Sequence, residues 1–125
     1  MDSLHTWGPP IWQTSIDDSI VQGLLEQGDA IRHREEFNAE IDLAMNTHDE
    51  WNYPPEVVEW FSKAIKTKVV DYMQIWAKHL GWTYNKWLSD WQIDSLWINY
   101  MQKYDCNPLH DHKGNVSFII YLNDV

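Results

Sequence analysis

Residues 55–81, PEVVEWFSKAIKTKVVDYMQIWAKHLG, are the stretch that decides the fold. The apolar and aromatic residues that recur along it at intervals of three or four positions are Val58, Phe61, Ile65, Val69, Tyr72, Met73, Trp76 and Leu80. This is the spacing of one face of an α-helix. Pro55 suits the first helical position, where its missing N–H costs no hydrogen bond, and Gly81 suits a helix end. The stretch therefore predicts one amphipathic helix, with Trp60 and Trp76 facing the core.

The residues before this helix predict further helix and a loop. Ile16, Ile20, Leu24 and Leu25 lie at helical spacing behind Ser15 and Asp17, which can cap a helix, and Gly28 is a candidate stop. A rougher helical stripe runs over residues 31–45. Residues 46–54, NTHDEWNYP, are rich in turn formers and predict a loop. Within that loop His48, Asp49 and Glu50 are adjacent, so their side chains do not converge on a metal and are expected to be solvated.

The pattern changes near Gly81 from helical to strand-like. Residues 95–104 and 115–122 are dense in β-branched and aromatic residues, which is typical of strands. Four tryptophans surround the change, namely Trp82, Trp87, Trp91 and Trp97. They suit either a clamp between helix and sheet or a platform for a sugar or base.

Composition limits the class of protein. The chain has 125 residues, 44% of them hydrophobic, and a formal net charge of −10. It is long enough for one folded domain, and its charge disfavours a broad nucleic-acid or membrane-surface footprint. One cysteine, Cys106, excludes an intrachain disulfide. With no candidate transmembrane or signal segment, we expect a cytoplasmic protein without a membrane partner.

The densest group of candidate ligands is LHDHKGN, residues 109–115. On a strand, His110 and His112 share one face, with Cα atoms about 6.6 Å apart. Neutral imidazoles at that spacing can chelate one ion of Fe, Zn, Cu or Ni. We therefore predict His110 and His112 as metal ligands at the entrance of a strand.

Residues 97–125 resemble the first metal-binding strand of iron(II)/2-oxoglutarate-dependent oxygenases, most closely the small phage and bacterial versions. The motif residues that carry the resemblance are Asn99, Tyr100, Asn107, Pro108, His110, His112, Ser117, Tyr121 and Leu122. The resemblance implies an α+β fold in which N-terminal helices pack on a partial double-stranded β-helix, a jelly-roll or cupin-like sheet. It also implies Fe(II) and 2-oxoglutarate as cofactors, His110 and His112 on the metal, and Asn99 and Tyr121 as cofactor-binding residues. The implied activity is hydroxylase-like oxidation of an unknown substrate.

The sequence departs from the family pattern at several points. His112 replaces the usual carboxylate, and Tyr104 stands where relatives often have glycine. No His follows His112 and no Arg follows Arg34, so the distal ligand and the cosubstrate-binding cation are missing. A complete eight-stranded barrel needs roughly 80 residues, more than the chain has left after Leu80.

These departures shape what we expect of the domain. We expect one domain, 1–125, with a helical platform over 1–81 and the first part of a β-helix core over 82–125, incomplete at its C-terminus. Alone it would be inactive, and its open sheet would favour self-association. Two alternatives stay open: a non-catalytic structural or interaction remnant of that fold, and a cupin-like metal protein. The cupin pattern places Glu four residues after the second His, where this chain has Val116.

Overall fold

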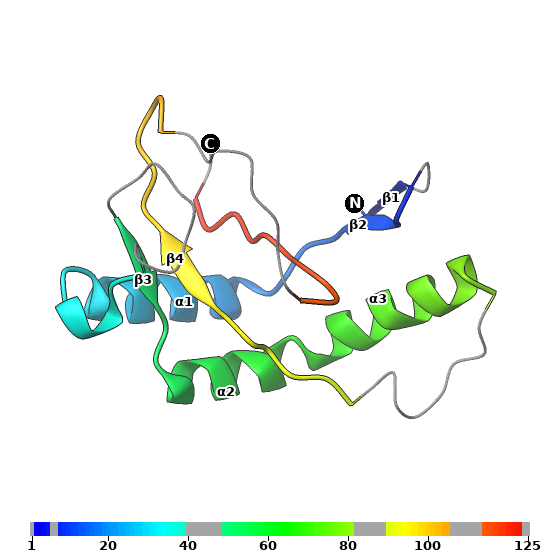
Figure 1. The fold of residues 1–125 in the computed structure, drawn as a ribbon, viewed down its shortest axis with the longest axis horizontal. Coiled ribbons are helices and arrows are strands. Elements are labelled where there is room, and N and C mark those ends of the chain that lie inside the picture. The colour runs from blue at the N-terminus through cyan, green and yellow to red at the C-terminus, as the bar shows by residue number, and fades with distance from the viewer. Residues whose placement is uncertain (1, 6–7, 40–48, 82–89, 106–113, 124–125) are drawn as a thin grey trace.

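The computed structural model describes residues 2–5, 8–39, 49–81, 90–105 and 114–123. Along the chain the elements are β1 (Ser3–His5), β2 (Ile11–Gln13), α1 (Asp18–Ile31), the 3-10 helix η1 (Glu35–Phe37), β3 (Glu50–Asn52), α2 (Pro55–Ala64), α3 (Lys66–His79) and β4 (Trp97–Asn99) (Figure 1). The described strands form two antiparallel pairs, β1–β2 and β3–β4. The expected α+β class is thus confirmed as a mixture of helix and sheet, whereas no jelly roll is formed by these residues.

Helix α1 begins where the sequence predicts and ends later. Asp17 is its N-cap residue, but Gly28 lies buried inside the helix rather than at its end. A Cβ atom on Gly28 would lie 2.6 Å from Cδ1 of Ile98 and 2.9 Å from the hydroxyl of Tyr100. The glycine is therefore a point of close approach between α1 and the chain around β4, and not a stop signal.

The predicted long helix is two helices that meet at Ile65. This residue has φ −99° and ψ 3°, yet its N–H still donates to Phe61 and its carbonyl still accepts from Val69. Its side chain is buried in the core. The predicted start at Pro55 and end at Gly81 are confirmed, and Gly81 has a φ of +72° that favours glycine.

The two tryptophans expected to face the core do not do so fully. Trp60 is 39% exposed and lies over Gly23 of α1, while Trp76 is half-buried with its ring 5.9 Å from that of His79. The prediction that Trp60 faces the core is wrong, because on α2 that role belongs to Val57 and Phe61.

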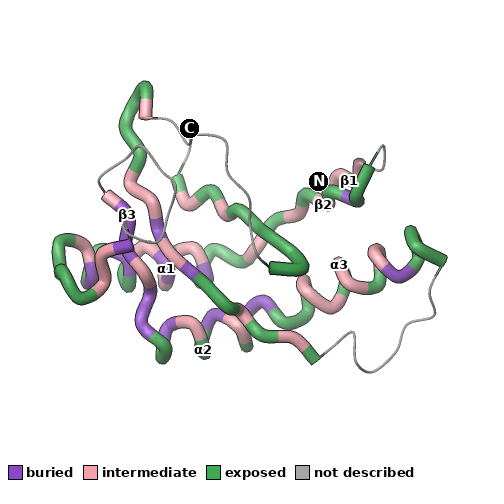
Figure 2. The backbone as a smooth tube through the Cα atoms, in the orientation of Figure 1, coloured by how far each residue is buried: buried purple, intermediate pink, exposed green. Residues whose placement is uncertain are grey.

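Strands β3 and β4 form a short ribbon that lies across α1 (Figure 1). Its register places Glu50 opposite Asn99 and Trp51 opposite Ile98. Trp51 and Ile98 belong to the buried core together with residues of α1 and α2. Figure 2 shows the buried positions gathered on the ribbon, α1 and α2, with few on α3. The ribbon is thus the sheet part of the core.

Several strand predictions need correction. Residues 46–54 were expected to be a loop, yet β3 lies among them, and three strands precede Gly81 in what was expected to be a helical platform. The predicted strand over 95–104 is reduced to β4, and none of residues 114–123 is in a strand. In place of a strand, this last segment exposes Ile119 and Tyr121, while Phe118 packs near Phe61 with ring centroids 5.8 Å apart.

The hairpin of β1 and β2 packs on α3. The Tyr72 hydroxyl donates to the Pro10 carbonyl at 2.5 Å, and Lys68 Nζ donates to Thr14 Oγ1 at 3.0 Å. The Tyr72 ring also stacks on Trp12 with centroids 6.4 Å apart. In the described ranges, no helix combines the length and apolar character needed to cross a membrane.

The two interior glycines of α1 give a matched stability test. We expect Gly28→Ala to lower the free energy of unfolding by about 1–3 kcal/mol, because Ile98 and Tyr100 are held in place and the added methyl overpacks the interface. Gly23→Ala should change it by less than about 1 kcal/mol, since the half-exposed Trp60 ring can move into solvent and alanine favours helix. Urea unfolding followed by circular dichroism measures both, and equal losses would contradict the packing assigned to Gly28.

Candidate functional site

The predicted metal ligands lie outside the described residues. His110 and His112 fall in 106–113, so the structure places neither of them. Among the residues that it does describe, no three His, Cys, Asp or Glu side chains gather as a metal site would require. The metal-binding role of the two histidines therefore stays a prediction.

Asn99, a predicted cofactor-binding residue, lies on β4 directly opposite Glu50. The backbone N–H of Tyr100 donates to the Asp49 carbonyl at 2.9 Å, so the neighbouring Glu50–Asn99 pair is of the non-hydrogen-bonded kind, in which side chains come closest. Both side chains leave the ribbon on the face opposite to the buried Ile98. This second face of the ribbon is therefore polar at its centre.

On this face the Glu50 side chain is buried, and Asn99 is partly buried with its amide oxygen inside. Glu50 is 1% exposed, and Oδ1 of Asn99 is buried and accepts no hydrogen bond from any residue in the described ranges. A buried amide oxygen without a donor costs free energy unless a partner satisfies it. The described fold therefore does not use Asn99 as an acceptor, and its amide is compatible with a role toward a ligand.

Tyr121, the other predicted cofactor-binding residue, is 75% exposed. The described structure does not enclose it together with Asn99, although both belong to the strand-like end of the sequence. Its role also stays a prediction.

Strand β4 is held in position by an ionic and aromatic cluster that we call the Arg32 clamp, formed by Arg32, Asp49, Trp51 and Tyr100. Arg32 Nε donates to Oδ1 of Asp49 at 3.1 Å, and its Nη2 pairs with Oδ2. Trp51 Nε1 donates to the same Oδ1 at 2.6 Å. The guanidinium lies 3.8 Å from the centroid of the Tyr100 ring. The Arg32 side chain at the end of α1 thus contacts the residue before β3 and the residue after β4.

The surroundings of the clamp shift the pKa values of its carboxylate, Asp49, and of two phenols, Tyr100 in the clamp and the nearby Tyr53. The hydrogen bond from Arg32 holds the pKa of Asp49 below its ordinary value, against the opposing effect of burial. Burial raises the pKa of Tyr100 and of Tyr53, and the hydrogen bond to Asp29 raises that of Tyr100 further. The Tyr100 hydroxyl donates to Asp29 at 2.7 Å. Asp49 is therefore ionised and both phenols are protonated near neutral pH.

The expectation that His48, Asp49 and Glu50 form a solvated loop is wrong for the two residues that the structure describes. Glu50 is buried and Asp49 is partly buried in the clamp. The alternation of Glu50, Trp51, Asn52 and Tyr53 was the signal for a strand, since apolar and polar residues alternate there. Turn-forming neighbours on both sides obscured it.

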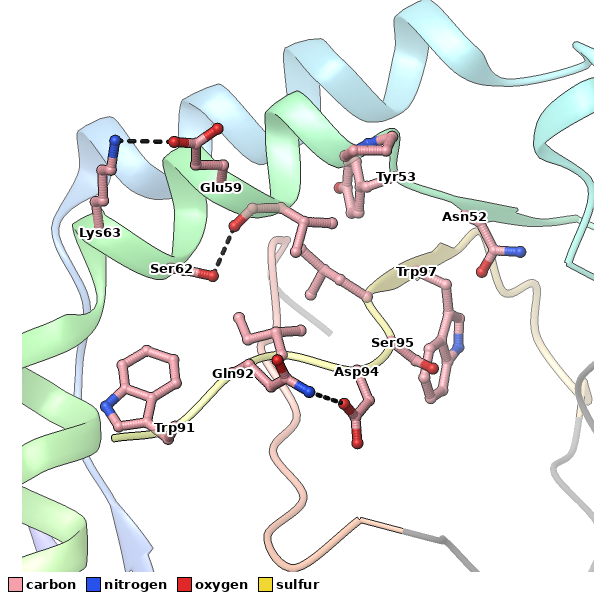
Figure 3. A pocket seen from close by; sticks show the side chains of 14 residues that line it. Asn52, Tyr53, Glu59, Ser62, Lys63, Trp91, Gln92, Asp94, Ser95 and Trp97 are labelled. Carbon is pink, nitrogen blue, oxygen red and sulfur yellow. Dashed lines mark hydrogen bonds and ion pairs between the residues drawn. The ribbon is translucent and has the colours of Figure 1, made fainter. Parts of the chain in front are cut away.

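A groove of about 780 Å³ lies beside the ribbon, between α2 and residues 91–97 (Figure 3). Trp91 and Trp97 line it, as do Asn52, Glu59, Lys63 and Asp94. Of the four tryptophans singled out around Gly81, these two therefore border open space, whereas Trp82 and Trp87 lie outside the described residues. The groove and Asn99 share the strand β4.

No family model, curated protein or solved structure matches this chain. The resemblance carried by the motif residues around His110 is therefore neither strengthened nor weakened by these comparisons.

The Arg32 clamp predicts how stability depends on pH. Because the pKa of Asp49 is lower in the folded chain than in the unfolded one, its stabilisation is present above about pH 4 and is lost as the pH falls through the folded value. Asp49→Asn should lower the free energy of unfolding at pH 7 by about 1–2 kcal/mol. The loss should shrink in acid, where the wild-type carboxyl is protonated as well.

Urea unfolding at pH 7 and pH 3 measures this difference. Glu36→Gln is the matched control, since Glu36 pairs with Arg34 at 2.6 Å on an exposed surface and should contribute little. An Asp49→Asn loss that is equal at both pH values would contradict the role of the ion pair.

Proposed function

We propose that this chain belongs to an oxygenase of the iron(II)/2-oxoglutarate type, which oxidises an unknown substrate. The observation that supports the proposal is the placement of Asn99. Its amide oxygen is buried on the polar face of the ribbon and has no donor among the described residues, and the buried Glu50 lies opposite. This is the residue that the resemblance assigns to cosubstrate binding.

Four residues of the chain would bind the metal and the cosubstrate. His110 and His112 would hold the metal through neutral imidazole nitrogens, which suit iron. Asn99 would orient the cosubstrate, because its amide nitrogen can donate to a carboxylate while its oxygen accepts from a hydroxyl or water. Tyr121 would offer a second hydroxyl contact. When bound, iron(II) and 2-oxoglutarate supply oxidative decarboxylation with dioxygen, giving succinate, carbon dioxide and an oxidised substrate.

The exposed C-terminal segment favours a second candidate, a non-catalytic interaction protein. Ile119 is 79% exposed and Tyr121 is 75% exposed, although apolar side chains of this density are typical of a buried strand. We expect the chain to self-associate as its concentration rises, measured by sedimentation velocity. Ile119→Lys should shift the distribution toward monomer, and a monomer at every concentration would contradict this second candidate.

The first proposal is tested by binding rather than turnover. Anaerobic titration with iron(II), with and without 2-oxoglutarate, should give a charge-transfer absorption band in the wild-type chain. We expect His110→Ala and His112→Ala to abolish the band, and Asn99→Ala to raise the concentration of 2-oxoglutarate that is needed by about ten-fold, since one charge-assisted hydrogen bond is lost.

His79→Ala is the matched control, because His79 is exposed at the end of α3 and should leave the band unchanged. Circular dichroism checks that each variant folds. A band that survives His110→Ala would show the metal assignment to be wrong.

A further inference from the structure

The groove between α2 and residues 91–97 has the composition of a site for an organic cation. The groove is open to solvent, and two indole rings line it. We propose that it binds the guanidinium group of an arginine side chain presented by a peptide partner. The proposal goes beyond the metal chemistry, because it uses only residues of the groove and needs no metal.

An exposed carboxylate lies between the two indoles along the chain. Asp94 accepts a hydrogen bond from Gln92 at 3.3 Å, and Figure 3 shows it between Trp91 and Trp97. It forms no ion pair with any cation in the described ranges. The faces of tryptophan rings attract cations more strongly than those of other aromatic residues. Among the described residues, the groove thus offers a carboxylate and two rings with no cation paired to that carboxylate.

The chain already binds one guanidinium with the same set of groups. In the Arg32 clamp, the guanidinium makes two contacts to the carboxylate of Asp49 and stacks at 3.8 Å on an aromatic ring, while an indole N–H donates to that carboxylate. The groove is lined by groups of the same kinds, a carboxylate in Asp94 and aromatic rings in Trp91 and Trp97. An arginine from outside would supply the missing member.

Charge supports a cation over other ligands. The chain carries a net charge of −10, so a cationic partner is attracted and a phosphate is repelled. Among the described residues that line the groove, Lys63 pairs with Glu59 at 3.1 Å, whereas Asp94 forms no ion pair. Guanidinium is favoured over ammonium because its plane can stack on an indole while its edge meets a carboxylate.

Two matched peptides test the proposal. Acetyl-Gly-Arg-Gly-amide and the same peptide with citrulline, which is neutral and nearly isosteric, are titrated into the chain while the indole N–H signals are followed by NMR. We expect the arginine peptide to shift the signals of Trp91 and Trp97, assigned by Trp→Phe variants, and to leave that of Trp12 unchanged. The citrulline peptide should bind at least about five-fold more weakly.

Variants separate a built site from general attraction to an acidic protein. Asp94→Asn should weaken the arginine peptide about three- to ten-fold, since the charged hydrogen-bond acceptor is lost. Asp105→Asn, which makes the same change of net charge outside the groove, should leave binding unchanged. Both residues lie outside regular secondary structure, so the variants are expected to fold.

Three results would overturn the proposal. Equal binding of the citrulline peptide would show that charge is not recognised. Equal effects of Asp94→Asn and Asp105→Asn would show attraction by net charge alone. A lysine peptide that binds as tightly as the arginine peptide would refute the guanidinium assignment.

Discussion

Arg32 contacts both Asp49 and Tyr100, and this contact joins the β3–β4 ribbon to the end of α1. An isolated two-stranded ribbon three residues long is not stable in water by itself. The clamp ties this ribbon to the end of α1 through a forked ion pair and a ring contact. Tyr53 adds a second tie by donating to the Leu24 carbonyl at 2.8 Å. The ribbon is therefore stabilised by its attachment to a helix more than by its own hydrogen bonds.

This attachment gives the ribbon two different faces. On one face Trp51 and Ile98 complete the core, where Gly28 lets the helix approach closely. On the other face Glu50 and Asn99 bring polar atoms into a buried position. A one-residue change of register would exchange the two faces, so the contacts that fix the register also place the candidate site.

Local signals predicted three helix boundaries and missed the end of α1 and the break between α2 and α3. Pro55 and Gly81 mark a start and an end because a fixed φ and a positive φ act within a few residues, while Asp17 is the N-cap residue of α1 without a side-chain capping bond. The predictions of a helix stop at Gly28 and of one continuous helix through Ile65 are wrong, because both residues take part in contacts with distant parts of the chain. The site was predicted only as far as Asn99, because the burial of Glu50 depends on its partner strand.

The acidic character of the chain and three helix boundaries, at Asp17, Pro55 and Gly81, could be predicted from the sequence. These follow from composition and from interactions between residues that are neighbours along it. The tertiary structure was needed to show that Asp49 forms an ion pair with Arg32, that Asn99 lies opposite Glu50, and that two tryptophans border a groove. Each of these contacts joins residues that are far apart in the sequence. The hydrophobic pattern alone allows many such pairings, and the packing of the ribbon on α1 fixes the ones that form.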